Sequence, residues 1–440
     1  MQTEQATLAG RGARADARGK PASLARRPFM IALFISVFGL LSTNDGATGA
    51  GSGAKELFWL LLGGAVLPGL MQFDRRLRLN LLRCSATLVL SLLLAYCLLS
   101  AIWSEAPWVS LRRAALLCVV VLICGATFAR DEVAPQNFVR LCSWPLCLLL
   151  LLSYLAVGLW PDLAAGPDGW RGVTAYKNGF GQLCALALLC CADEYWRKQR
   201  LEWLALLGLA AAGLLLSRSM SCIVAAGVAM PLSVVLLISR TLLARRSTQA
   251  WFYGPLLLLA FMLYLLYASG SIPDFDTLTT GVFKLMGKSQ TLSGRTELWN
   301  VVFKNFRYHS PWLGGGFGAF WNGLDSAAGY TAWQFSGGYL GQAHNGYIDL
   351  YNDIGILGMA LFAMLLLCQI HGLMLLWRSA HSEFYFHFCF LIMVLLLSYS
   401  ESFLLRGTHA WNILFLASYL RVAALVRQAP RARLTPAKEI

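Results

Sequence analysis

Long apolar stretches alternate with short polar connections along almost the whole chain. Most of these stretches approach the ~20 residues that a helix needs to cross a bilayer. Inside lipid only helices and closed barrels satisfy every backbone polar group, and continuous apolar runs indicate helices. The pattern therefore predicts an all-α polytopic membrane protein with about 12 transmembrane helices. The apolar stretches are residues 29–43, 56–72, 84–102, 113–129, 138–159, 178–193, 202–217, 221–239, 251–268, 346–377, 383–403 and 410–426.

The composition agrees with this class. Of the 440 residues, 58% are hydrophobic and 13% are charged, and the mean hydropathy is +0.59. Soluble domains carry roughly 45–50% apolar and about 25% charged residues. One globular core cannot hide so much apolar surface, which argues against a large soluble helical protein. The 12 cysteines lie mostly in apolar segments without the spacing of a zinc site or a disulfide framework, so we interpret them as small core residues.

Basic residues set the expected orientation. A net charge of +14 would suggest a nucleic-acid partner in a soluble protein. In a membrane protein, however, Lys and Arg gather in the short cytoplasmic connections. Placing both termini in the cytoplasm puts the large majority of the Lys and Arg residues of short connections on that side. We therefore expect cytoplasmic termini and no nucleic acid among the partners.

One connection is too long to be a simple linker. It carries four tryptophans and the glycine cluster "GGGFG" at 314–318, and we expect it to pack as a cap on the outer membrane surface. The predicted organisation is a basic, disordered cytoplasmic tail (1–28), transmembrane helices 1–9 (29–268), a large periplasmic loop (269–345), transmembrane helices 10–12 (346–426) and a cytoplasmic tail (427–440). The first tail lacks the cleavage pattern of a signal peptide.

The unusual charged residues fall on the outer face in this topology. A charge in or near the bilayer is costly and is by default a functional hypothesis, although any single one could be an interfacial anchor. Guanidinium groups bind phosphate oxygens in two-point contacts, so several of them beside an apolar wall suit a lipid-linked diphosphate. These residues are Arg112, Arg113, Arg171, Lys177, Arg218, Arg295, His344, Glu401 and Arg406.

His344 is the strongest candidate for a general base on this face. Its reference pKa near ~6.5 allows it to accept a proton at neutral pH. The alternative is a histidine that only caps a helix or bonds within its loop. Asn345 is a good N-cap for the apolar run that follows. His309 and His409 lie on the same face and are rivals.

Several catalytic motifs are absent from the sequence: Walker A, HExxH, the G-x-S-x-G elbow and a paired-aspartate signature. Chemistry at this face would therefore run without a nucleotide. A diphosphate leaves readily once cations neutralise it, and the attacking hydroxyl then needs only a base. We expect no cofactor, and the residues alone leave open whether the reaction also runs without a metal.

Three motifs near the C-terminal third, "GRTELW", "PWLGGGFGAF" and "AHNGYIDLYNDIGILG", occur in this order. They follow "WSEAPWVSLRRA", "WRGVTAYKNGFGQLCALA" and "LLSRSMS". The combination resembles the signature of the O-antigen ligase and polysaccharide polymerase superfamily over about residues 90–425. That family is similar in architecture, with about a dozen helices and one large periplasmic loop, here expected between helices 9 and 10.

The resemblance implies a metal-independent, inverting glycosyltransferase of the bacterial inner membrane that uses undecaprenyl-diphosphate-linked glycans as donors. Arg295 matches the essential loop arginine, and His344 matches the essential histidine before the tenth helix. Arg171 and Lys177 match the basic motif at the diphosphate, and Arg218 matches more loosely. On this hypothesis Asn345 fixes the helix start, while "GILG" lets the helix pack closely against a neighbour.

The acceptor stays open at this level. The sequences of the motifs resemble those of exopolysaccharide polymerases more closely. Such polymerases add the glycan to another lipid-linked repeat unit, and a chain-length regulator is a further expected partner. A ligase would transfer the glycan to lipid A–core, and an oligosaccharyltransferase to protein. A transporter for a lipid-linked sugar would instead place its charges along a cavity at mid-membrane depth. A structural scaffold would explain neither the clustered charges nor the histidine.

Overall fold

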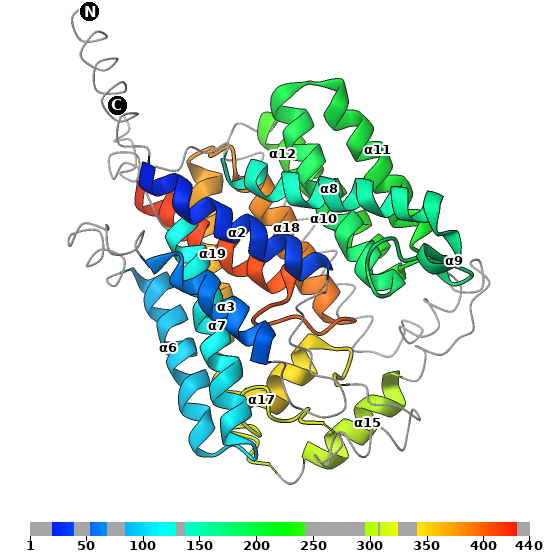
Figure 1. Cartoon of the computed structure of the whole chain (residues 1–440). Helices are drawn as coiled ribbons and strands as arrows, with labels where there is room; N and C mark the ends of the chain where they lie inside the picture. Colours follow the sequence, from blue (N-terminus) through cyan, green and yellow to red (C-terminus); the bar gives the residue numbers. More distant parts are fainter. Residues whose placement is uncertain are drawn as a thin grey trace, which may run out of the picture.

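The computed structural model describes residues 20–38, 53–67, 84–128, 137–242, 295–306, 309–323 and 341–428. These residues are mostly helical (Figure 1). The elements in chain order are α2 (Lys20–Phe38), α3 (Gly53–Gly64), α6 (Ser85–Leu99), the 3-10 helix η1 (Ser100–Ile102), α7 (Pro107–Phe128), α8 (Asn137–Leu159), α9 (Pro161–Ala164), β1 (Ala165–Gly166), β2 (Gly169–Trp170), α10 (Lys177–Lys198), α11 (Leu201–Leu216), α12 (Met220–Leu242), α15 (Arg295–Phe306), α17 (Gly346–Arg378), α18 (Phe384–Ser398) and α19 (Ala410–Gln428).

The predicted class, an all-α membrane protein, is confirmed. Within the described part, six helices are long and apolar enough to cross a membrane: Ser85–Ile102, Pro107–Phe128, Phe138–Leu159, Met220–Leu237, Gly346–Arg378 and Ala410–Arg427. Two more apolar helices, α11 and α18, are shorter. The expected span at 251–268 and much of the expected loop at 269–345 lie outside the described residues.

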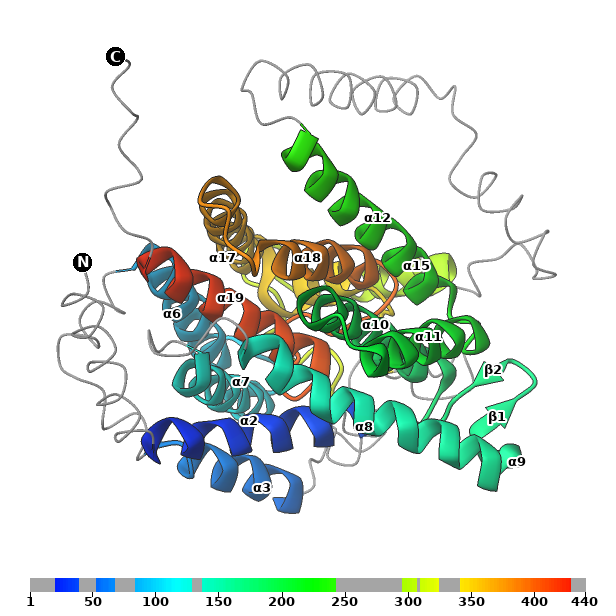
Figure 2. The ribbon, with the colours of Figure 1, turned by 90° about the horizontal axis from the view of Figure 1, so that it is seen from above.

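Helix α19 lies inside the bundle, between α7, α17, α6 and α18 (Figure 2). Of its most apolar 18-residue window, 89% is buried by the rest of the chain, although this helix has the lowest hydropathy of the six. The fully buried side chains Trp411, Tyr419 and Arg421 belong to it. A helix enclosed by protein can hold polar groups because neighbouring side chains, rather than lipid, surround them.

Helix α17 is broken at Gly355, where φ is 60° and ψ is −168°. The break leaves backbone groups on both sides without partners in the helix. The amides of Ile356 and Leu357 donate instead to the carbonyls of Pro311 (2.9 Å) and Trp312 (3.1 Å). Lipid offers no hydrogen-bond acceptors to free amides, so a break in a membrane helix needs such replacement partners from the protein.

The glycine cluster satisfies the carbonyls at the same break. The amides of Gly315 and Gly316 donate to the carbonyls of Asn352 (2.8 Å) and Asp353 (3.1 Å). A β-carbon on Gly355 would lie 2.6 Å from the amide nitrogen of Gly314, so the backbones of these two segments are in direct contact. The close approach expected of "GILG" is therefore made to this loop segment and not to a neighbouring helix.

Alanine at Gly355 is expected to destabilise the protein by about 1–3 kcal/mol, because the added carbon overpacks a backbone contact. The positive φ, unfavourable for alanine, adds to the effect. Thermal unfolding in detergent measures the change. Gly208→Ala in α11 is the matched control, since nothing lies within 4 Å of the added carbon. Equal melting temperatures for Gly355→Ala and Gly208→Ala would contradict the proposed contact.

Candidate functional site

His344 precedes α17 in a left-handed backbone conformation, with φ at 50°. This conformation costs a residue with a β-carbon roughly 1–2 kcal/mol, so surrounding contacts must hold it. The imidazole is half-buried, and its Nδ1 lies 3.2 Å from Nε2 of Gln342. Part of the ring therefore stays accessible while its orientation is constrained.

Asn345 caps α17. Its Oδ1 accepts hydrogen bonds from the amides of Tyr347 (3.0 Å) and Ile348 (3.2 Å), and the residue is buried. A side-chain oxygen at this position satisfies amides that the first helical turn leaves without partners. The predicted capping role is confirmed, whereas a contact between Asn345 and substrate stays a prediction.

Asp349, one turn into α17, is a buried carboxylate that the sequence analysis missed. Its Oδ1 accepts from Nε1 of Trp321 (2.8 Å) and from the amide of Ala343 (3.0 Å). Its Oδ2 accepts from Nη2 of Arg406 at 3.0 Å. The available signal was an acidic residue shortly after the cap of an apolar helix, where a charge is costly without partners.

The loop between α18 and α19 brings two predicted residues to the start of α17. Besides Asp349, the guanidinium of Arg406 binds the carbonyl of Gly341 at 3.4 Å. Glu401 is buried, and its Oε1 accepts from Nδ2 of Asn178 at 2.7 Å. This loop therefore joins the start of α10 to the segment that carries the histidine.

Arg171, Lys177 and Arg218 lie around the hairpin formed by β1 and β2. Arg218 Nη1 donates to the carbonyl of Pro167 (2.9 Å), and Lys177 Nζ to that of Asp168 (3.4 Å). A β-carbon on Gly166 would lie 3.3 Å from Nη2 of Arg171. The two guanidinium groups belong to exposed residues. The structure thus brings Arg218 together with Arg171 and Lys177, two cations that lie much earlier in the sequence.

Arg112 and Arg113 have protein partners. Arg112 Nε lies 3.1 Å from Oε1 of Glu56, which ties α7 to α3. Arg113 donates to the carbonyls of Gly318 and Trp321, which ties α7 to the glycine cluster. Both guanidinium groups therefore stabilise packing, and a contact between either of them and substrate stays a prediction.

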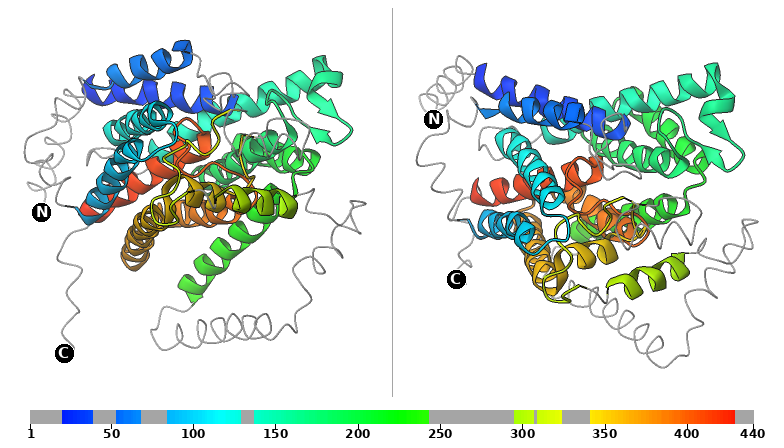
Figure 3. Two further views of the ribbon diagram at one scale, coloured as in Figure 1. Left: turned by 90° about the horizontal axis from the view of Figure 1, so that it is seen from below. Right: turned by 60° about the horizontal axis from the view of Figure 1, so that its bottom comes forward.

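Arg295 is the first residue of α15, and its side chain lies outside the described part. The helix itself lies beside the start of α17 (Figure 3). Leu298 and Val302 pack against Trp321 and Ala343, and Nε1 of Trp299 donates to the Ala343 carbonyl at 2.9 Å. Helix α15 is therefore anchored next to His344.

The two rival histidines occupy other surroundings. Burial, together with the positive charge of Arg406, lowers the pKa of His409 to about 4. Its Nδ1 lies 3.3 Å from the amide of Trp411, so the ring is neutral at pH 7 and caps α19. His309 Nδ1 lies 3.4 Å from Oε1 of Glu105. The backbone amide of His409 donates to the carbonyl of Arg406 at 3.0 Å, and the ring of His309 packs against Phe320.

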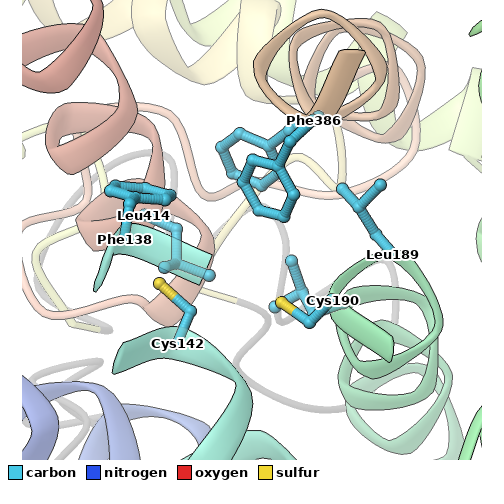
Figure 4. Close-up of a pocket in the computed structure, with 8 residues that line it drawn as sticks. Phe138, Cys142, Leu189, Cys190, Phe386 and Leu414 are labelled. Atoms are coloured by element: carbon cyan, nitrogen blue, oxygen red, sulfur yellow. The ribbon is translucent and has the colours of Figure 1, made fainter. Parts of the chain in front are cut away.

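An apolar cavity lies between α8, α10, α18 and α19 (Figure 4). Phe138, Cys142, Leu189, Cys190 and Phe386 are among its lining residues. Because no charged side chain lines it, it does not suit a diphosphate or a glycan. Among the described residues, no group of three or more His, Cys, Asp or Glu side chains is placed to hold a metal ion.

Residues 205–363 match the family model described as O-antigen ligase. This segment is therefore similar to the O-antigen ligase family. The matched residues include Arg218, Arg295 and the whole segment from His344 to Asp349. The match supports a glycosyltransferase-like enzyme with lipid-linked glycan substrates, in a multi-pass bacterial membrane protein. A search of curated proteins finds no match to the chain.

Proposed function

We propose that the protein polymerises undecaprenyl-diphosphate-linked oligosaccharide repeat units into exopolysaccharide or O-antigen on the periplasmic face of the inner membrane. The observation that carries the proposal is a continuous set of contacts. Cations surround the β1–β2 hairpin just before α10, and Asn178 at the start of α10 binds Glu401. Arg406, in the same loop as Glu401, binds Asp349 beside the histidine segment. These contacts support a single site that includes the proposed diphosphate-binding surface and the proposed base.

In the proposed reaction, Arg171, Lys177 and Arg218 bind the donor diphosphate and neutralise its charge. His344 accepts the proton of the acceptor hydroxyl, whose oxygen attacks the anomeric carbon. The bond between that carbon and the phosphate oxygen breaks, and undecaprenyl diphosphate leaves with the electron pair. Attack opposite the leaving group inverts the anomeric configuration. Arg295, the first residue of α15, is the further cation that we expect to act on the donor.

The proposal includes the finer architecture expected from the sequence. It has 12 transmembrane helices, cytoplasmic termini and a periplasmic loop between helices 9 and 10. A chain-length regulator is the expected partner. Metal independence belongs to the same proposal, and we expect transfer to persist in excess EDTA.

A ligase that transfers the glycan to lipid A–core is the second candidate, supported by the description of the matched family. The same surface would serve it, since the donor is the same. The break in α17 is a feature that a transporter could use. In this protein, however, the 311–316 segment binds the amides and carbonyls at the break, and the hydroxyl of Tyr96 binds the carbonyl of Ile354 at 2.9 Å. These backbone groups are therefore already bonded within the protein, which argues against a substrate site at the break.

Reconstitution of the purified protein in liposomes with a lipid-linked repeat unit as the only glycan tests the proposal. A ladder of longer lipid-linked glycans supports a polymerase. Transfer that occurs only after lipid A–core is added identifies a ligase. Movement of the donor between leaflets without any new glycosidic bond would overturn both and identify a transporter.

A further inference from the structure

We propose that Asp349 is a positioning residue for His344. The inference rests on the proposed function, because it assigns to this carboxylate the task of holding the base of that reaction. Asp349 reaches the histidine segment directly, by accepting from the amide of Ala343. It also reaches that segment through Arg406, which binds the carbonyl of Gly341.

The contacts hold the backbone on both sides of the histidine. Ala343, immediately before it, is fixed by the carboxylate, and Asn345, immediately after it, is fixed by its own capping bonds. His344 keeps φ at 50° between these two points. A conformation that is unfavourable by itself persists only where its surroundings determine it. The carboxylate binds the first of these two points, Ala343, directly.

Asp349 joins three segments that are distant in the sequence. Its donors are Trp321 in the loop after α15, Ala343 before α17 and Arg406 between α18 and α19. Both oxygens are occupied, and the residue is 4% exposed. Its place in the first turn of α17 is favourable for a negative charge, since the helix dipole is positive there. A buried carboxylate whose two oxygens both accept from protein donors suits positioning rather than contact with substrate.

The test compares Asp349→Asn with wild type in the reconstituted transfer assay. Asparagine keeps the shape and can still accept from Ala343, but it loses the ion pair with Arg406. We expect kcat to fall about 10- to 100-fold, because a small misplacement of a catalytic group has effects of this size. The KM for the lipid-linked donor should change less than about twofold. Asp193→Asn is the matched control: this aspartate pairs with Arg197, outside the proposed site, and its variant should keep the wild-type kcat.

A double variant separates positioning from a general structural role. In the His344→Ala background there is no base to position, so Asp349→Asn should cause no further loss of the residual single-turnover rate. If the two losses multiply, Asp349 acts independently of His344 and the inference is wrong. Wild-type kcat in Asp349→Asn would overturn it as well.

Asp349→Glu covers the case in which the asparagine variant does not fold. It keeps the charge but is longer by one methylene, so it should fold and still lose kcat. A fully active Asp349→Glu protein would show that the position of this carboxylate does not matter, which also overturns the inference. Failure of the proposed function is distinguishable, because then wild type itself shows no transfer.

Discussion

Replacing His344 with alanine is expected to lower glycan transfer by about 10²–10⁴-fold, the usual contribution of a positioned acid or base. The protein should still insert and fold, because the imidazole is half-buried and its bond to Gln342 joins two neighbouring residues of one loop. Single-turnover transfer from a labelled lipid-linked donor measures the loss, and size-exclusion chromatography in detergent checks the fold.

Two further variants show whether the imidazole itself is responsible. His344→Gly removes the ring and suits the positive φ, so it should be as inactive as the alanine variant without backbone strain. His371→Ala removes an exposed imidazole from the other end of α17 and should keep full activity. Substantial transfer by His344→Gly would exclude the histidine as the base and reopen the choice between His309 and a base supplied by the substrate.

Removing the guanidinium of Arg421 is expected to cause the largest loss of stability, about 3–5 kcal/mol. Arg421 in α19 and Glu383 before α18 are both fully buried. They form two hydrogen bonds, from Nη2 to Oε1 at 2.7 Å and from Nε to Oε2 at 3.1 Å. His387 extends the network from Glu383 to Ser418. Arg421→Met leaves a buried carboxylate without its main partner, and thermal unfolding in detergent measures the cost.

Two comparisons test the cause of that loss. Combining Arg421→Met with Glu383→Leu removes both charges and should restore part of the stability, because no unpaired charge is then buried. Glu202→Gln removes one partner of the exposed pair with Arg200 and should cost less than about 1 kcal/mol. If the melting temperature of Arg421→Met were as high as that of Glu202→Gln, the buried network would not stabilise the bundle.

Local pattern was enough to predict the helices and the start of α17. The apolar stretch 138–159 predicts α8 almost to the residue. The N-cap is predicted from Asn345 and the apolar run that follows it. Both follow from interactions within a few positions along the chain, since helix caps and apolar runs are local features. The motifs around His344 likewise sufficed for the resemblance to the superfamily, which the family match confirms.

Only the tertiary structure decided which charges are partners of one another. The sequence analysis put Arg112 and Arg113 in the same class as Arg171 and Arg218. In the structure the first two are partly buried and bind Glu56 and loop carbonyls, whereas the last two are exposed. It also overlooked Asp349. These contacts join residues that are far apart in the chain, and no periodicity records them. The role of a buried charge depends on the groups that surround it, and the packing of distant helices determines which groups these are.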